Sequence, residues 1–344
     1  MLSVEYIPMQ YYDAILIQFT GEDGMLHTII VDGGHIDLPK FCYTERLKKK
    51  LELIFSNGNS IDLWIVTHID NDHIGGLYSF INDSVFFETY HDRLKEVWMN
   101  YGDNGDFNVQ RTGVIGYNDG KKLRDAIVEK HVCIKQNILA GELATISDAI
   151  ITVVAPNVDA MKRYLKWWNS HEFKDVVQTA DGFVKGYEWD YNKRFKDFDP
   201  DKYEEDKEVK NNSSIAFIIT FKSYRLLFAA DSCTSILKAG LEKMKMYENG
   251  TLKLDFMHIP HHGSSRNTSI EFLRSIHCQR YMITGNGENR YKLPDKETIA
   301  RLIFANPSGC EIHFTQLNSK LKEIFEDDEH DNLTIVSEAI FNFT

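Results

Sequence analysis

The sequence has only five cysteines and seven prolines among its 344 residues, and it contains no long apolar run. The cysteines are scattered, odd in number and never spaced as CxxC, which indicates reduced structural thiols and gives no sign of a zinc finger. No stretch approaches the roughly 20 apolar residues that cross a bilayer. The first residues lack a basic segment followed by an apolar run, so they do not predict a signal peptide. These absences predict a cytoplasmic protein.

Basic charge is also scarce. The chain has 39 lysines and arginines against 51 aspartates and glutamates, which gives a formal net charge of −12. A protein that binds duplex DNA irrespective of sequence needs a basic face, so this balance argues against that class. A nucleotide, a single-stranded end or a nucleic acid presented by a partner fits better, and a local basic groove stays compatible with the composition.

Apolar segments rich in β-branched residues alternate with helical patterns along most of the chain. We predict strands at 14–19, 28–31, 61–67, 149–155, 215–221, 225–230, 254–259, 281–284 and 311–314, and helices at 44–55, 232–243 and 298–305. Two strand-rich halves with helices predict an α/β sandwich of two sheets covered by helices. We expect a single domain over residues 1–344.

Two stretches depart from this alternation. Residues 85–140 contain many glycines, and we expect much of this stretch to be loop. Residues 157–210 are charged and aromatic, and we predict that they form an insertion. Within the insertion, residues 193–210 are expected to be solvated, and the aromatic part from Trp167 to Trp189 is a candidate surface for docking a protein partner.

The strongest chemical signal follows the strand predicted at 61–67. Four potential ligands, His68, Asp70, Asp72 and His73, fall within six residues. Two carboxylates and two imidazoles packed together are costly without a cation, and this mixture suits zinc, manganese or iron. The alternative is a solvated polar loop without metal. The following Gly75 and Gly76 are expected to let the backbone turn tightly.

Further candidates follow two later strands. Asp231 comes directly after the strand at 225–230, where it could bind a metal or cap the helix at 232–243. His261 and His262 follow the strand at 254–259. Alone they could be ordinary loop residues, but together with the upstream motif they predict a functional role. His258 is expected to be structural.

The motif H-x-D-x-D-H-x-G-G resembles the H-x-H-x-D-H signature of the metallo-β-lactamase fold. With Asp70 in place of the second histidine, it resembles the branch typified by the hydrolase domain of the DNA-uptake protein ComEC. The segments that share this resemblance are 12–17, 30–34, 211–215, 226–231, 261–265 and 286–294. The resemblance covers most of the chain except the insertion, and it implies an αββα sandwich of two mixed β-sheets flanked by helices.

The resemblance also implies roles and a function. By this resemblance, the metal ligands are expected to be His68, Asp70, Asp72, His73, Asp231 and His261, with Asp231 bridging two ions. The expected catalytic residues are Asp72 and His262. The cofactor would be one or two divalent ions, zinc or manganese. The expected activity is hydrolysis by a metal-activated water, with a phosphodiester as substrate, as in a nuclease or a nucleotide phosphodiesterase.

Two departures from the family pattern support an alternative. Ala155 and Leu293 stand where relatives have histidine before proline, and neither side chain can bind a metal. The chain could therefore hold only one ion firmly, or it could be a degenerate binding module that acts with a partner protein and has little or no activity. Hydrolysis of β-lactams is disfavoured by Asp70 and by the missing export signal.

Overall fold

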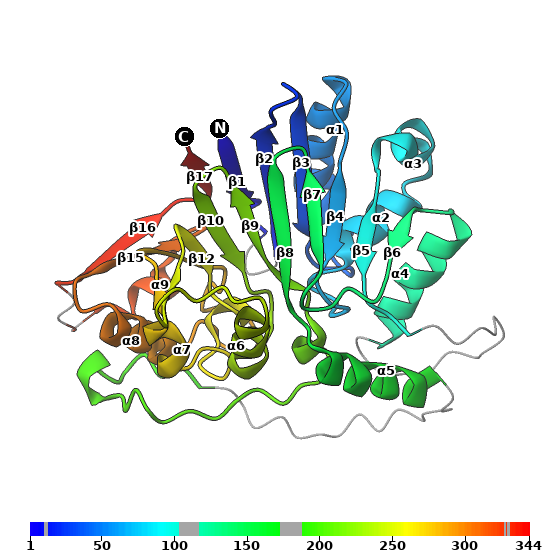
Figure 1. Ribbon diagram of the computed structural model, residues 1–344. Coiled ribbons are helices and arrows are strands. Elements are labelled where there is room, and N and C mark those ends of the chain that lie inside the picture. Colours follow the sequence, from blue (N-terminus) through cyan, green and yellow to red (C-terminus); the bar gives the residue numbers. More distant parts are fainter. Residues whose placement is uncertain (10–12, 103–116, 173–187, 327, 329–330) are drawn as a thin grey trace.

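The computed structural model describes residues 1–9, 13–102, 117–172, 188–326, 328 and 331–344. Within these residues two large β-sheets pack face to face, and helices cover their outer faces (Figure 1). The first sheet has the order β17 (Ile340–Phe343), β1 (Leu2–Tyr6), β2 (Ala14–Thr20), β3 (Leu26–Asp32), β4 (Leu63–Val66), β5 (Val97–Met99) and β6 (Ile134–Lys135). The second has the order β16 (Leu333–Ser337), β15 (Cys310–Phe314), β14 (Arg280–Ile283), β12 (Phe256–His258), β10 (Tyr224–Phe228), β9 (Ala216–Phe221), β8 (Ala149–Ala155) and β7 (Leu143–Ile146).

Both sheets are mixed. In the first sheet β17, β1, β2 and β3 pair antiparallel, while β3, β4, β5 and β6 run parallel. In the second sheet β7, β8, β9 and β10 are antiparallel, and the strands from β10 to β16 are parallel. A small separate ladder joins β11 (Leu252–Lys253) and β13 (Ile276–His277). The predicted αββα sandwich of two mixed sheets is therefore confirmed.

The strands are apolar on both faces because both faces are covered. In β2, Ile15 and Ile17 belong to the core between the sheets, whereas Leu16 belongs to the core under the helices. This division follows the period of two along a strand, which sends successive side chains to opposite faces. A strand of this kind reads as a continuous apolar run and not as an alternating one.

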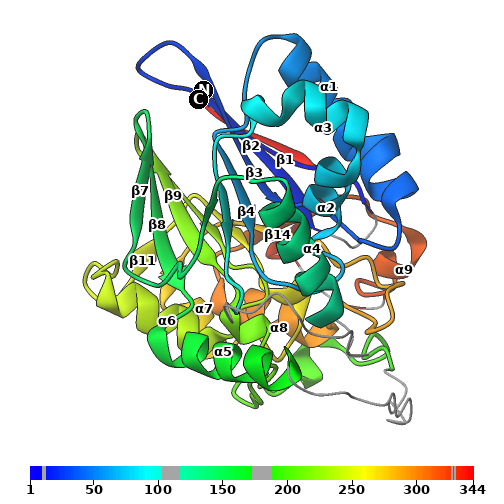
Figure 2. The same cartoon turned by 90° about the vertical axis from the view of Figure 1, so that its right-hand side faces the viewer.

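The helices form two outer layers, and no described helix is both long and apolar enough to cross a membrane. The first sheet is covered by η1 (Lys40–Leu47), α1 (Lys48–Ser56), α2 (Gly75–Asn82), α3 (Ser84–Tyr90) and α4 (Tyr117–Glu129). The second is covered by α6 (Thr234–Lys243), α7 (Ile270–Arg274), α8 (Lys296–Ala305) and α9 (Ser319–Lys322). Helix α5 (Val158–Glu172) lies across one end of the sandwich (Figure 2).

Parallel strands bring their carboxyl ends to one edge of each sheet. The chain leaves β3 at Asp32, β4 at Val66, β10 at Phe228 and β12 at His258. The loops that follow β4, β10 and β12 carry the predicted ligands. Loops that follow parallel strands are the usual place for a site in sheets of this kind.

Three sequence-based predictions about local structure were wrong. Residues 85–140, expected to be largely loop, contain most of α3, β5, α4 and β6, although 103–116 lie outside the described residues. Residues 193–210, expected to be solvated, bury Phe195, Phe198 and Asp206. Gly75 and Gly76 do not make a tight turn; they begin α2 and allow close approach, because a Cβ on Gly76 would lie 2.7 Å from the Cα of Gly33.

Candidate metal centre

The loop after β4 is held by Asp32, at the end of β3. One carboxylate oxygen of Asp32 accepts the backbone N–H of Thr67 at 2.8 Å, and the other accepts the Thr67 hydroxyl at 2.8 Å. The second oxygen also lies 2.8 Å from Nδ1 of His73. A carboxylate on Nδ1 places the proton there and turns the free Nε2 toward the opposite side, which is how proteins orient metal-binding histidines.

Three more histidines are oriented in the same way. Nδ1 of His68 lies 3.1 Å from the Thr67 hydroxyl, Nδ1 of His262 lies 3.0 Å from the Thr284 hydroxyl, and Nδ1 of His261 lies 3.0 Å from Oδ1 of Asn267. In each ring Nε2 is left to face inward.

The Nε2 atoms of His68, His73 and His262 are all buried, and none of them has a hydrogen-bond partner among the described residues. A buried imidazole nitrogen without a partner is costly in a folded protein, and a bound metal ion, which accepts electron pairs, would remove that cost at these three atoms.

Asp231 lies at the centre of these nitrogens. Its Oδ2 is 3.6 Å from Nε2 of His68, 3.6 Å from Nε2 of His261 and 3.8 Å from Nε2 of His73. Asp72 approaches from the side, with its oxygens 3.7 Å from Nε2 of His73 and 3.4 Å from Nε2 of His262. Ligand atoms of zinc lie about 2 Å from the ion, so pairs of ligand atoms lie about 3 to 4 Å apart.

One set of four side chains meets this requirement closely, and we call it the first donor set. It consists of Asp13, His73, Asp231 and His262, all buried, which offer ligand atoms within 4.8 Å of one another. Imidazole and carboxylate donors in this proportion suit zinc, manganese or iron. The donor chemistry and the unpaired nitrogens therefore fit a divalent ion.

A second grouping, the second donor set, consists of His68, Asp70, Asp231 and His261. Oδ2 of Asp70 is 3.9 Å from Nε2 of His68. Its other oxygen is taken by Lys210, whose Nζ lies 2.5 Å away. Burial disfavours charge on Lys210, but the Asp70 carboxylate holds the pKa of the ammonium above its usual value.

Charges inside the centre strongly shift its titrating groups. Burial disfavours ionisation of Asp72, yet the imidazoles of His73 and His262 hold the pKa of that carboxyl well below its usual value. Burial likewise opposes protonation of His262, but Asp13 and Asp72 raise its pKa to about 9. Burial and the adjacent His73 lower the pKa of His68 well below its usual value, so that ring is neutral and able to bind an ion.

All of the ligands and catalytic residues predicted from the sequence thus lie in one region. The predicted residues are His68, Asp70, Asp72, His73, Asp231, His261 and His262, and their individual roles stay predictions. The capping role considered for Asp231 is wrong, because α6 begins after an N-cap at Cys233. His258, expected to be structural, is buried with Nε2 3.8 Å from Asp13.

Three residues of the centre were missed by the sequence analysis: Asp13, Asp32 and Lys210. A signal existed for Asp32, because a carboxylate at the end of a buried strand next to Gly33 and Gly34 is unusual. Lys210 gave no local signal, since it lies in a stretch with many charges of both signs.

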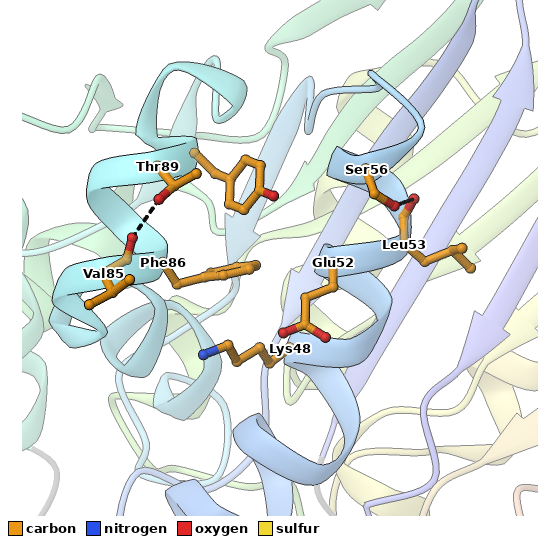
Figure 3. A pocket seen from close by; sticks show the side chains of 8 residues that line it. Lys48, Glu52, Leu53, Ser56, Val85, Phe86 and Thr89 are labelled. Atoms are coloured by element: carbon orange, nitrogen blue, oxygen red, sulfur yellow. Dashed lines mark hydrogen bonds between the residues drawn. The ribbon is translucent and has the colours of Figure 1, made fainter.

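A surface hollow lies outside the centre. It is lined by residues of α1 and α3, among them Lys48, Glu52 and Phe86, and it contains none of the residues of the centre (Figure 3). Lys48 lies 2.5 Å from Asp83 there.

Comparison with known proteins identifies the family to which this fold belongs. The family model of the metallo-β-lactamase superfamily matches residues 27–276, from β3 to β13. The chain belongs to the metallo-β-lactamase superfamily. No curated protein shows a significant sequence match to this member of the superfamily.

Several solved structures are similar to this metallo-β-lactamase family member. YhfI from Bacillus subtilis, a metallo-β-lactamase fold protein, is 11% identical with a TM-score of 0.40, over 99% of this chain and 98% of YhfI. A diphosphatase of the PhnP family is 13% identical with a TM-score of 0.40, over 97% of this chain and 85% of that one. CmlA from Streptomyces venezuelae, a diiron β-hydroxylase, is 10% identical with a TM-score of 0.38, over 99% of this chain and 54% of CmlA, so the chain spans about half of its length.

Proposed function

We propose that this metallo-β-lactamase family member is a hydrolase that uses a bound zinc or manganese ion to cleave a phosphodiester. The observation that carries the proposal is the set of unpaired Nε2 atoms of His68, His73 and His262 around Asp231, in a superfamily that consists mostly of metal-dependent hydrolases. A divalent ion bound there would lower the pKa of a coordinated water to near neutrality.

For the two adjacent histidines we propose the reverse of the roles implied by the sequence. His262 belongs to the compact first donor set with His73 and Asp231, and its side chain is 7% exposed. His261 is more accessible, with a side chain that is 22% exposed. We therefore assign His262 to the ion. Its neighbour His261, held at Nδ1 by Asn267, is assigned to proton transfer to the leaving oxygen.

Asp72 is the carboxylate best placed to orient the attacking water. Its side chain is 23% exposed, against 4% for Asp231. The neighbouring imidazoles favour its ionised form, so it accepts hydrogen bonds. A water bound to Asp72 on its open side would be positioned for attack.

Two observations favour an anionic phosphodiester as the substrate. The resemblance to the ComEC-like branch is strongest at 261–265, which carries both histidines. The second observation is the basic loop 285–294, which lies next to these histidines. It begins after Thr284, whose hydroxyl contacts His262, and it ends at Pro294, which packs against Gly263.

This loop carries Arg290 and Lys292 in a protein that is otherwise acidic. Nζ of Lys292 and Nζ of Lys320 each lie 3.7 Å from the centroid of the Trp189 ring. The ammonium groups held by this ring would attract an anionic phosphate group of a substrate.

The second candidate function is a binding module that has lost turnover. Ala155 and Leu293 favour it, because both are buried at the positions where relatives have histidine. A protein that retains an ion but hydrolyses no phosphodiester would support this function.

The proposal is tested by removing metal with EDTA, reloading with zinc or manganese, and assaying bis(p-nitrophenyl) phosphate, cyclic nucleotides and single-stranded oligonucleotides. We expect metal-dependent hydrolysis that falls at least about 100-fold in Asp72→Asn. Asp92→Asn is the matched control, because Asp92 is exposed and precedes β5, at the opposite end of the parallel strands from the centre. Absence of hydrolysis with every metal and substrate would overturn the proposal.

A further inference from the structure

Lys210 is a partly buried cation that points into a centre rich in metal-binding groups. Its ammonium lies 2.5 Å from Oδ1 of Asp70, and its side chain is only 15% exposed. A lysine is seldom this buried unless it is paired. Neither Lys210 nor its ion pair follows from the ligand motif, since the lysine comes from the segment that we predicted to be an insertion.

Hydrogen bonds fix the backbone around Lys210, and this holds its side chain in position beside Asp70. The Lys210 carbonyl accepts the N–H of Ser213 at 3.0 Å and its hydroxyl at 2.7 Å. The next residue, Asn211, donates to Asp206 at 2.8 Å, and the backbone N–H of Asp206 donates to the carbonyl of Arg266 at 2.9 Å. This network anchors the loop on the segment that follows His261 and His262.

The Lys210 ammonium lies against Asp70, one of the two carboxylates of the second donor set. Asp70 is the only carboxylate of that set that is not shared with the first donor set, because Asp231 belongs to both. An ion bound by Asp70 and His68 would lie beside the Lys210 ammonium and would be repelled by it. With the charge of Asp70 balanced by Lys210, the second set offers an ion only two imidazoles and a shared carboxylate.

The first donor set has no such competitor among the described residues. Asp13, His73, Asp231 and His262 face one another, and the ion pair of Lys210 lies with Asp70. The two groupings therefore differ in charge although they share Asp231.

We propose that Lys210 takes the place of a second metal ion, so that this centre binds one divalent ion tightly, at the first donor set. The ammonium neutralises Asp70 and supplies a fixed positive charge on the side where a second ion would otherwise bind. This inference rests on the proposed function only in requiring that the centre binds a divalent ion.

The test is the metal content of the full-length protein after loading with excess zinc and desalting, measured by elemental analysis. We expect one ion per chain for the wild type and two for Lys210→Met, in which Asp70 is released. Lys210→Arg, which keeps the charge, and the double variant Lys210→Met/Asp70→Asn should return to one. Lys48→Met is the matched control, because Lys48 forms a 2.5 Å ion pair with Asp83 away from the centre and should leave the content at one.

Two ions in the wild type would overturn the inference while leaving the proposed hydrolase intact, and this outcome needs no variant to fold. One ion in a folded Lys210→Met, verified by circular dichroism, would also overturn it. No ion in the wild type would instead remove the proposed function itself.

Discussion

Replacing Asp32 by asparagine should weaken metal binding without removing any ligand. The Asp32 carboxylate holds the proton of His73 on Nδ1, 2.8 Å away, and leaves Nε2 free for an ion. The asparagine oxygen can still accept the Thr67 N–H, but its NH2 group would then face Nδ1 of His73 and donate to it. The imidazole would carry its proton on Nε2, a form that cannot bind a metal.

The size of the effect follows from what the carboxylate does. Removing a group that orients a ligand lowers metal affinity about 10- to 100-fold, or about 1.4 to 2.7 kcal/mol. Because the tautomer of His73 itself changes, we expect the loss of zinc affinity in Asp32→Asn to lie near the upper end of this range. The dissociation constant for zinc is measured by competition with a chromophoric chelator, together with the urea midpoint of the metal-free protein.

The control is another aspartate with the same kind of contacts. Asp62 accepts the backbone N–H of Thr28 at 2.8 Å and lies 3.3 Å from Nδ1 of His27, outside the centre. Asp62→Asn should leave the zinc affinity unchanged. Equal affinity in wild type and Asp32→Asn, or an equal loss in both variants, would refute the orienting role of Asp32.

Three further predictions concern pH and packing. The pKa of His262 is raised to about 9, and, against the opposing effect of burial, Asp72 and Asp32 raise the pKa of His73 well above its usual value. An ion must displace a proton from each ring, so zinc affinity should rise up to about 100-fold per pH unit from pH 7 toward 9; affinity that is flat with pH would contradict this. Burial and the nearby Asp190 raise the pKa of Asp295 to about 6, so its ionisation destabilises the fold as pH rises from about 4 through 6. Asp295→Asn should lack that loss and gain about 1 to 3 kcal/mol at pH 7 by urea unfolding, whereas a neutral or destabilised variant would count against it. Trp168→Ala should lose about 3 to 5 kcal/mol, because Trp168 is fully buried against Tyr117 and Tyr164, and a loss below about 1 kcal/mol would show that the site can collapse.

The ligand motif could be read from the sequence because its information is local. Four donors within six residues after a buried strand must lie close together whatever the rest of the chain does. The central strands of both sheets were likewise readable, since strands such as β2 and β8 are apolar runs that need cover on two faces. The outer strands β1, β5, β6, β7, β16 and β17 were not predicted. Asp231 and the two adjacent histidines followed from the resemblance and from their positions after strands.

The missing parts depend on contacts between distant segments. Asp13 and Lys210 reach the centre from 55 or more residues away from His68, and nothing in their neighbourhoods indicates a site. In residues 193–210 the many charges concealed Phe195 and Phe198, whose burial fixes the segment against the second layer of helices. Composition describes a segment on average, whereas a few apolar anchors decide where it lies.

The most direct measurement is a crystal structure of the zinc-loaded protein with anomalous diffraction recorded on both sides of the zinc edge. We expect one strong anomalous peak, enclosed by Asp231, His73 and His262, with the Lys210 ammonium still on Asp70. A map with no peak among these side chains, or with the imidazoles turned away from Asp231, would contradict the claim that this centre holds a catalytic ion.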